Sequence, residues 1–179
     1  MAKKSREERR SAVIEVLNKA RSMELQAIHQ YMNQHYGMDD MDYGDLAKNL
    51  KLVALVEMRH AEGFAERVKE LGGEPTADKA GDVKKGQAVQ AVFSFDANLE
   101  DHTIDTYNQF LLVCQQNGDS VSAKLFENTI KEEQEHYNYF DNIAGHIEQL
   151  GDTYLASIAG TPSSTGLAPQ GYAVNQGGE

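Results

Sequence analysis

The residues with the clearest capacity for chemistry are two pairs of glutamate and histidine. Glu57 and His60 are three residues apart, and Glu133 and His136 repeat this spacing 76 residues later. On a helix, this spacing places a carboxylate and an imidazole one turn apart on nearly the same face, so both can bind one metal ion. One such pair is weak evidence for a metal site, whereas two matching pairs support each other.

The two halves of the chain share a wider plan. At the same offset, Glu24 corresponds to Glu100, and a tyrosine follows each of these glutamates after seven residues, Tyr31 and Tyr107. Two helical hairpins related by a pseudo-twofold axis would bring six possible ligands to one point inside a four-helix bundle, as in ferritin-like di-metal proteins. The six predicted ligands are Glu24, Glu57, His60, Glu100, Glu133 and His136.

The charge of this predicted site points to two metal ions. Four ionised carboxylates in an apolar bundle would repel one another unless cations compensate them, and two divalent ions balance four negative charges. Oxygen and nitrogen ligands without thiolate suit iron or manganese, although donor type alone does not exclude zinc. The spacing leaves the individual roles open: Glu57 and Glu133 are terminal ligands only if Glu24 and Glu100 bridge or supplement the ions.

Several other residues have a structural interpretation beside a functional one. Tyr31 and Tyr107 either hydrogen-bond a bridging carboxylate, donate an electron, or are ordinary core residues. Cys114 is interpreted as a core residue. Four histidines have no partner at ligand spacing and are predicted to lie at the surface or next to the ligands: His29, His35, His102 and His146.

The elements that must position these residues are predicted to be helices, because apolar residues recur at helical spacing. Ser5 and Glu8 match a capping box at the start of the first helix. Gly37 is predicted to end that helix, and Asp96 to cap the third. The predicted helices run from Ser5 to about residue 36, from about 43 to 71, from 96 to about 117, from 119 or 120 to about 150, and over 153–159.

The connection between the second and third predicted helices, residues 72–95, is long and glycine-rich. Such a length lets the chain cross the bundle, so that the third helix runs parallel to the second. The acidic link 39–45 resembles a calcium loop, but its glycine comes one place early and Lys51 replaces the final carboxylate. We expect an all-α, ferritin-like four-helix bundle with a short fifth helix over residues 1–159, followed by a Gly/Ser/Thr/Pro-rich tail at 160–179.

Composition limits the class of protein further. The 179 residues carry a formal net charge of −11, which argues against nucleic-acid binding and suits a protein that attracts cations. A single cysteine excludes a disulfide framework and favours a reducing compartment. No signal segment or membrane-spanning run is evident. We therefore expect a cytoplasmic protein that binds neither nucleic acid nor a membrane.

Met58 follows Glu57 directly and therefore points about 100° away from it on a helix, toward the outside of the bundle. A methionine in this position most often packs at a subunit contact. Its thioether can also ligate haem iron. The sequence position alone does not separate the packing interpretation from the haem interpretation.

The combined motifs resemble the bacterioferritin family over about residues 11–159. The resemblance rests on the stretches 17–19, 24–31 and 57–62, on Glu100, and on the segment 133–136. It implies a di-iron ferroxidase centre, made of the six predicted ligands, in each of 24 subunits of a hollow shell. It also implies a haem shared between two subunits and ligated by Met58 from both, with Leu25 and Ile28 nearby, and a fifth helix around fourfold pores.

The function implied by this resemblance is iron storage and detoxification. O2 or H2O2 would oxidise Fe(II), ferric mineral would fill the shell, and haem, reduced by an electron-donor protein, would assist iron release. Some family members bind an auxiliary iron through a His and an Asp, where this chain has Leu52 and Val56, so that site is expected to be absent. The alternatives are a rubrerythrin-like peroxidase, which normally needs four cysteines, another di-metal peroxidase or catalase, and a structural bundle without metal.

Overall fold

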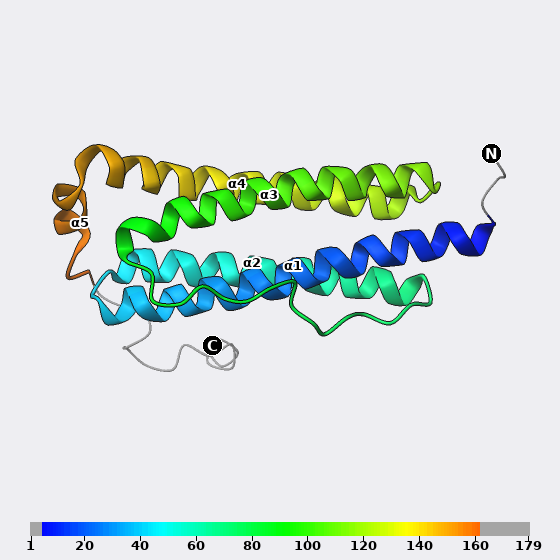
Figure 1. The fold of residues 1–179 in the computed structure, drawn as a ribbon, viewed down its shortest axis with the longest axis horizontal. Helices are drawn as coiled ribbons and strands as arrows, with labels where there is room; N and C mark the ends of the chain where they lie inside the picture. Colours follow the sequence, from blue (N-terminus) through cyan, green and yellow to red (C-terminus); the bar gives the residue numbers. More distant parts are fainter. Residues whose placement is uncertain (1–4, 162–179) are drawn as a thin grey trace, which may run out of the picture.

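The computed structural model describes residues 5–161, which form five helices and a long crossover. Two antiparallel hairpins make the bundle, and α5 lies across one end of it (Figure 1). Contacts between α1 and α3 and between α2 and α4 join the hairpins. The predicted all-α, ferritin-like fold is confirmed. The helices are α1 (Arg6–Asp40), α2 (Gly44–Glu70), α3 (Val89–Gln116), α4 (Ser120–Leu150) and α5 (Asp152–Ile158).

The predicted capping box at the start of α1 is present. The Ser5 hydroxyl accepts a hydrogen bond from the Glu8 backbone N–H at 3.1 Å, and the Glu8 carboxylate accepts one from the Ser5 N–H at 2.6 Å. At the start of α4, Asp119 caps in a similar way by accepting from the Ser122 N–H at 2.9 Å. Local side chains therefore satisfy free amides at both helix starts.

The predicted end of α1 at Gly37 is wrong, because the helix continues to Asp40. A glycine inside a helix costs only about 1 kcal/mol, and the extra turn buries Met38. The chain leaves the helical conformation at Asp42, which has φ 61°, and the Tyr43 N–H donates to the Met38 carbonyl at 2.9 Å. Burial beyond the glycine thus outweighs its weak helical preference.

The predicted start of α3 at Asp96 is also wrong, because the helix begins two turns earlier, at Val89. Val89, Val92 and Phe93 are buried at helical spacing and form the first turn, where the sequence was interpreted as part of a connection. Asp96 is fully buried inside the helix and accepts a hydrogen bond from the Gln34 amide at 2.7 Å. Tertiary packing against α1 therefore sets this boundary.

The crossover, residues 71–88, runs along α1 and lets α3 start parallel to α2, as predicted (Figure 1). Side chains of α1 hold it along its length. The Asn18 amide bonds the backbone of Glu74 and Thr76, and the Gln30 amide bonds both backbone groups of Lys84, at 2.8–3.0 Å. These bonds satisfy backbone polar groups that have no regular secondary structure.

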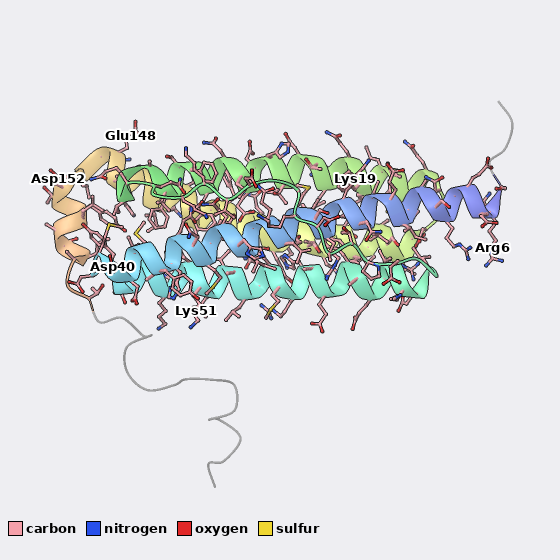
Figure 2. All side chains as sticks on the ribbon, turned by 60° about the horizontal axis from the view of Figure 1, so that its bottom comes forward. Arg6, Lys19, Asp40, Lys51, Glu148 and Asp152 are labelled. Carbon is pink, nitrogen blue, oxygen red and sulfur yellow. The ribbon has the colours of Figure 1, made fainter. Side chains whose placement is uncertain are left out.

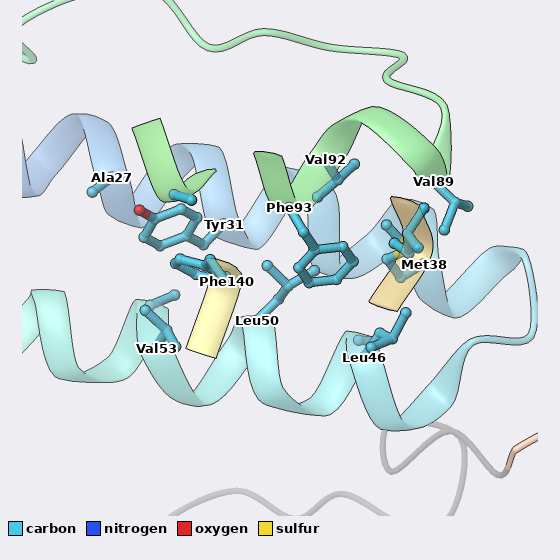
Figure 3. Close-up of a cluster of buried hydrophobic side chains, with 14 of the residues drawn as sticks. Ala27, Tyr31, Met38, Leu46, Leu50, Val53, Val89, Val92, Phe93 and Phe140 are labelled. Carbon is cyan, nitrogen blue, oxygen red and sulfur yellow. The ribbon is translucent and has the colours of Figure 1, made fainter. Parts of the chain in front are cut away.

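The core consists of two apolar clusters. One lies toward α5 and contains Tyr31, Phe93 and Phe140 (Figure 3). The other lies toward the start of α1 and contains Phe64, Tyr107 and Phe126. Because the two tyrosines belong to different clusters, the region between them is bounded by packed aromatic side chains on both sides.

Thr161 and Gly160 attach the end of the described chain to the α1–α2 turn. The Gly160 N–H donates to the Asp42 carbonyl at 2.9 Å, and Thr161 bridges to Tyr43. Asp152, the residue before the fifth helix predicted over 153–159, is instead the first residue of α5 and makes no capping hydrogen bond. Most of the predicted tail, residues 162–179, lies outside the described residues. Among the helices of residues 5–161, none is long and apolar enough to cross a membrane.

Candidate di-metal centre

The six predicted ligands come together in the middle of the bundle. Their side chains project inward from all four long helices and are at most 8% exposed. Glu24 comes from α1, Glu57 and His60 from α2, Glu100 from α3, and Glu133 and His136 from α4. A cluster of this kind, buried between two apolar layers, needs compensation by protons or by cations.

The six residues form two overlapping groups, each with four possible ligands. One group contains Glu24 and His60, the other contains Glu100 and His136, and both contain Glu57 and Glu133. Within each group, the ligand atoms lie within 4.8 Å of one another. The geometry therefore makes Glu57 and Glu133 the shared carboxylates and leaves one carboxylate and one histidine at each end.

This arrangement bears on the roles that the spacing leaves open. Glu24 and Glu100 do not lie between the two groups, as bridging ligands would; each supplements one group, and Glu57 and Glu133 belong to both. His60 Nδ1 lies 2.9 Å from Glu57 Oε2 and 3.1 Å from Glu133 Oε1. His136 Nδ1 lies 2.8 Å from Glu57 Oε1 and 3.1 Å from Glu133 Oε2. Each shared carboxylate thus faces both histidines.

Each tyrosine hydrogen-bonds the end carboxylate of the other half of the repeat. The Tyr107 hydroxyl donates to Glu24 at 2.5 Å, and the Tyr31 hydroxyl donates to Glu100. Of the roles considered for these tyrosines, hydrogen bonding to a carboxylate is the one observed, but the partner is an end carboxylate and not a shared one. The cross-pairing ties α1 to α3 directly beside the centre.

Burial and mutual contacts divide the carboxylates into two protonation classes. Burial, together with the charges of Glu133 and Glu57, raises the pKa of Glu24 and of Glu100 well above the ordinary value. Burial also acts to raise the pKa of Glu133, but contacts with His136 and His60 outweigh it and lower the pKa to about 2. Burial therefore favours the protonated form of Glu24 and Glu100, whereas the two histidines favour the ionised form of Glu133.

The histidines carry the balancing positive charge. Burial acts to lower the pKa of each imidazole, but interactions with Glu133 and Glu57 outweigh it. The pKa of His60 rises to about 12 and that of His136 to about 9. At neutral pH both imidazoles are therefore charged beside the ionised Glu133, while burial favours the neutral form of the two end carboxyl groups.

The centre can hold two divalent cations with this set of ligands. Glu57 Oε1 and Glu133 Oε1 are buried and receive no well-aligned hydrogen bond from the described residues, so each has a lone pair for a metal ion. Two divalent ions bring four positive charges, so their entry displaces protons from the ligands. Oxygen and imidazole donors suit iron or manganese.

Glu132, which the sequence interpretation missed, makes the two ends of the centre unequal. Its carboxylate lies 3.0 Å from His60 Nε2, the outer nitrogen of the ring. At the repeat offset, the residue that corresponds to Glu132 is Val56, which cannot act in the same way on His136. A carboxylate on the outer nitrogen fixes the orientation of a ligating histidine. In the sequence, only the position of Glu132 directly before Glu133 indicates that it could lie beside the centre.

The remaining singled-out residues lie away from the centre. Met58 points outward and is 48% exposed, and Cys114 is buried in the core. His29, His102 and His146 are exposed. His35 is neither at the surface nor beside the ligands; it is buried, and its Nδ1 lies 2.7 Å from the Ala47 carbonyl oxygen, where it links α1 to α2.

Fold and centre together define the class of ferritin-like di-metal carboxylate proteins. A family model described as a ferritin-like domain matches residues 14–150. The chain is 65% identical to a bacterioferritin of Desulfovibrio desulfuricans, with 94% of each chain covered. It is 33% identical to a bacterioferritin of Streptomyces coelicolor, with 82% of this chain and 88% of that one covered.

Solved structures agree with these relatives. A crystal structure of the D. desulfuricans bacterioferritin, described as showing its diiron site in different catalytic states, matches with a TM-score of 0.90 and 64% identity over 95% of this chain and 99% of that one. A Mycobacterium tuberculosis bacterioferritin matches with a TM-score of 0.78 and 28% identity over 82% and 93%. The chain belongs to the bacterioferritin family, whose members are multimeric iron-storage proteins and ferroxidases.

Proposed function

We propose that the six buried residues bind two Fe(II) ions, that O2 or H2O2 oxidises them there, and that the ferric product is stored. The observation that carries this proposal is the pair of ligand groups sharing Glu57 and Glu133. Shared carboxylates hold two metal ions next to each other, so that two electrons can leave for one oxidant molecule. Iron is the substrate, and each ion supplies one electron.

The protein's own residues manage position and charge in this reaction. Glu132 holds His60 in place, and Tyr31 and Tyr107 hold the end carboxylates through their hydroxyl groups. As metal ions enter, the two histidines and the two end carboxylates release their protons. The aromatic layers on both sides keep water away from the centre and strengthen its electrostatic interactions.

Met58 is the residue that we propose as the haem ligand. Its side chain is half-exposed on the outer face of α2, so its thioether is available to the iron of a haem bound on that face. A haem there would be shared with the same residue of a second copy. When bound, it would supply electrons for the reduction and release of stored iron, with Leu25 and Ile28 nearby.

The assembly is proposed as a shell of 24 copies, in which α5 lies around the fourfold pores. The net charge of −11 supports the attraction of ferrous ions and argues against nucleic acid as a partner. An electron-donor protein is the proposed partner for haem reduction. The buried free thiol of Cys114 is consistent with the proposed cytoplasmic location.

The alternatives lack a supporting observation of equal weight. A rubrerythrin-like peroxidase normally needs four cysteines, and the chain has one. A catalase or other di-metal peroxidase uses similar ligands, and a structural bundle would not need six inward-facing ligands in two overlapping groups. Particle size and a visible spectrum separate a haem-bearing shell from these classes.

Aerobic oxidation of Fe(II) by the purified protein tests the proposal. Two Fe(II) per subunit should be oxidised in a fast phase, and the double variant Glu57→Ala and His60→Ala should lose that phase. Glu62→Ala is the matched control, because Glu62 is exposed two residues further along α2. A fast phase that survives in the double variant would contradict the assignment of the centre.

A further inference from the structure

A cavity of about 660 Å³ opens between α1, α3 and the crossover, on the side of the centre where the end carboxylates lie. Ala27 and Thr103 line it, and each follows an end carboxylate, Glu24 or Glu100, by three residues. Residues three apart on a helix lie on neighbouring parts of one face. The floor of the cavity is therefore adjacent to both end carboxylates.

The lining of this cavity follows the pseudo-twofold symmetry of the centre. At the repeat offset of 76 residues, three pairs of lining residues correspond to each other: Met23 with Leu99, Gln26 with His102, and Ala27 with Thr103. A cavity lined by such pairs lies on the axis that relates the two hairpins. That axis also passes between the two metal positions, so a molecule in the cavity is placed equally with respect to both.

The charge of the lining selects against a cation. Met23, Leu99 and Phe110 give it an apolar surface, and Lys19 and His102 are its ionisable residues. Among the described residues that line the cavity, none is acidic. Ferrous ions gain no attraction from such a surface, whereas a small uncharged molecule needs none.

A second cavity, of about 510 Å³, opens on the opposite side of the centre, between α2 and α4. It also lies on the pseudo-twofold axis, because Val56 corresponds to Glu132 and Arg59 to Glu135 at the same offset. This lining is polar, holds two carboxylates beside the basic residues Arg59 and Lys131, and reaches the predicted ligand His136. The two openings on one axis therefore differ in chemistry, and of the two only this polar opening offers carboxylates to an iron ion.

We propose that the cavity between α1 and α3 is the binding site and entrance for the small uncharged oxidant, O2 or H2O2. This inference rests on the proposed ferroxidase function. O2 takes one electron from each of two Fe(II) ions and two protons to give H2O2, and H2O2 likewise takes two electrons and two protons to give two molecules of water. An oxidant that arrives on the axis meets both electron donors at once.

The crossover passes over α1 and α3 (Figure 2), and it therefore gives a direct way to close this cavity. Ala80 is exposed and lines the cavity, and its N–H donates to the Ser22 carbonyl of α1 at 2.9 Å, which anchors it over the opening. Ala80→Trp should fill the entrance. Ala77→Trp is the matched control, because Ala77 is exposed on the same crossover but does not line the cavity.

The experiment starts from protein loaded anaerobically with two Fe(II) per subunit, so that iron entry does not contribute to the rate. Rapid mixing with O2, and separately with H2O2, should show several-fold slower oxidation in Ala80→Trp and wild-type rates in Ala77→Trp. Slowing with only one of the two oxidants would identify it as the molecule that uses the cavity. Equal rates in Ala80→Trp and Ala77→Trp would overturn the inference.

Xenon provides a test that does not depend on a variant. It occupies apolar cavities, and crystals of the wild-type protein under xenon pressure should show it between Met23 and Leu99. Xenon binding elsewhere but not in this cavity would overturn the inference. Failure of the proposed function would look different, because wild-type protein would then neither bind Fe(II) anaerobically nor oxidise it.

Discussion

Anaerobic loading of the centre with two divalent ions should release about four protons per subunit at pH 7. Four ligands favour their protonated form there, and each must lose its proton to bind a metal ion. Burial raises the pKa of Glu24 and Glu100 well above the ordinary value, and contacts with Glu133 and Glu57 raise the pKa of His60 to about 12 and of His136 to about 9. Because Glu133 has a pKa of about 2, it adds none.

This number also balances the charge that the two ions bring. Two divalent ions bring four positive charges, and four departing protons remove four. The combined affinity for the two ions should therefore rise by about four powers of ten per pH unit near pH 7. Above pH 9 the release should fall to about three, because the metal-free His136 has then lost its proton.

Titration of the metal-free protein with Co(II) in a weakly buffered solution, monitored with a pH indicator, measures this release. Glu62→Ala should behave like the wild type, because that carboxylate is exposed. Glu24→Gln should release about one proton fewer, since the amide has none to give. A release of one proton or none at pH 7 would refute the assigned protonation states, and with them the charge balance of the centre.

Three further predictions concern single side chains. Tyr107→Phe removes the hydroxyl that donates to Glu24 and should cost the metal-free protein about 1–3 kcal/mol in free energy of unfolding; an unchanged urea midpoint would contradict this. Burial raises the folded-state pKa of Asp96 to about 8, so the wild-type fold loses stability as the pH rises from about 4 to 8. Asp96→Asn removes this ionisable group and should therefore stabilise the fold, relative to the wild type, increasingly over the same range, by up to a few kcal/mol. Thermal midpoints at several pH values check this, and a pH-independent difference would count against it. Met58→Leu should abolish haem absorption in the visible spectrum while leaving the fast oxidation of Fe(II) intact; retention of haem would exclude Met58 as its ligand.

Much of the fold was predictable from local pattern. The capping box at Ser5 and the ends of α3 and α4 near Gly118 and Gly151 follow from short-range hydrogen bonding and backbone preference, which the sequence contains directly. The two wrong boundaries, at Gly37 and Asp96, have one cause. Both residues look like helix ends in isolation, but burial of neighbouring side chains against other helices extends the helix past them.

For the centre, the sequence by itself determined the six candidate ligands, because helical periodicity and the repeat offset fix which side chains share a face. It also determined that Met58 points away from them. Only the tertiary structure decided that Glu57 and Glu133 are shared, that each tyrosine bonds the carboxylate of the other half, and that Glu132 supports only His60. Such choices depend on how the two hairpins meet across the pseudo-twofold axis, and no spacing within one helix records the distance between side chains on different helices.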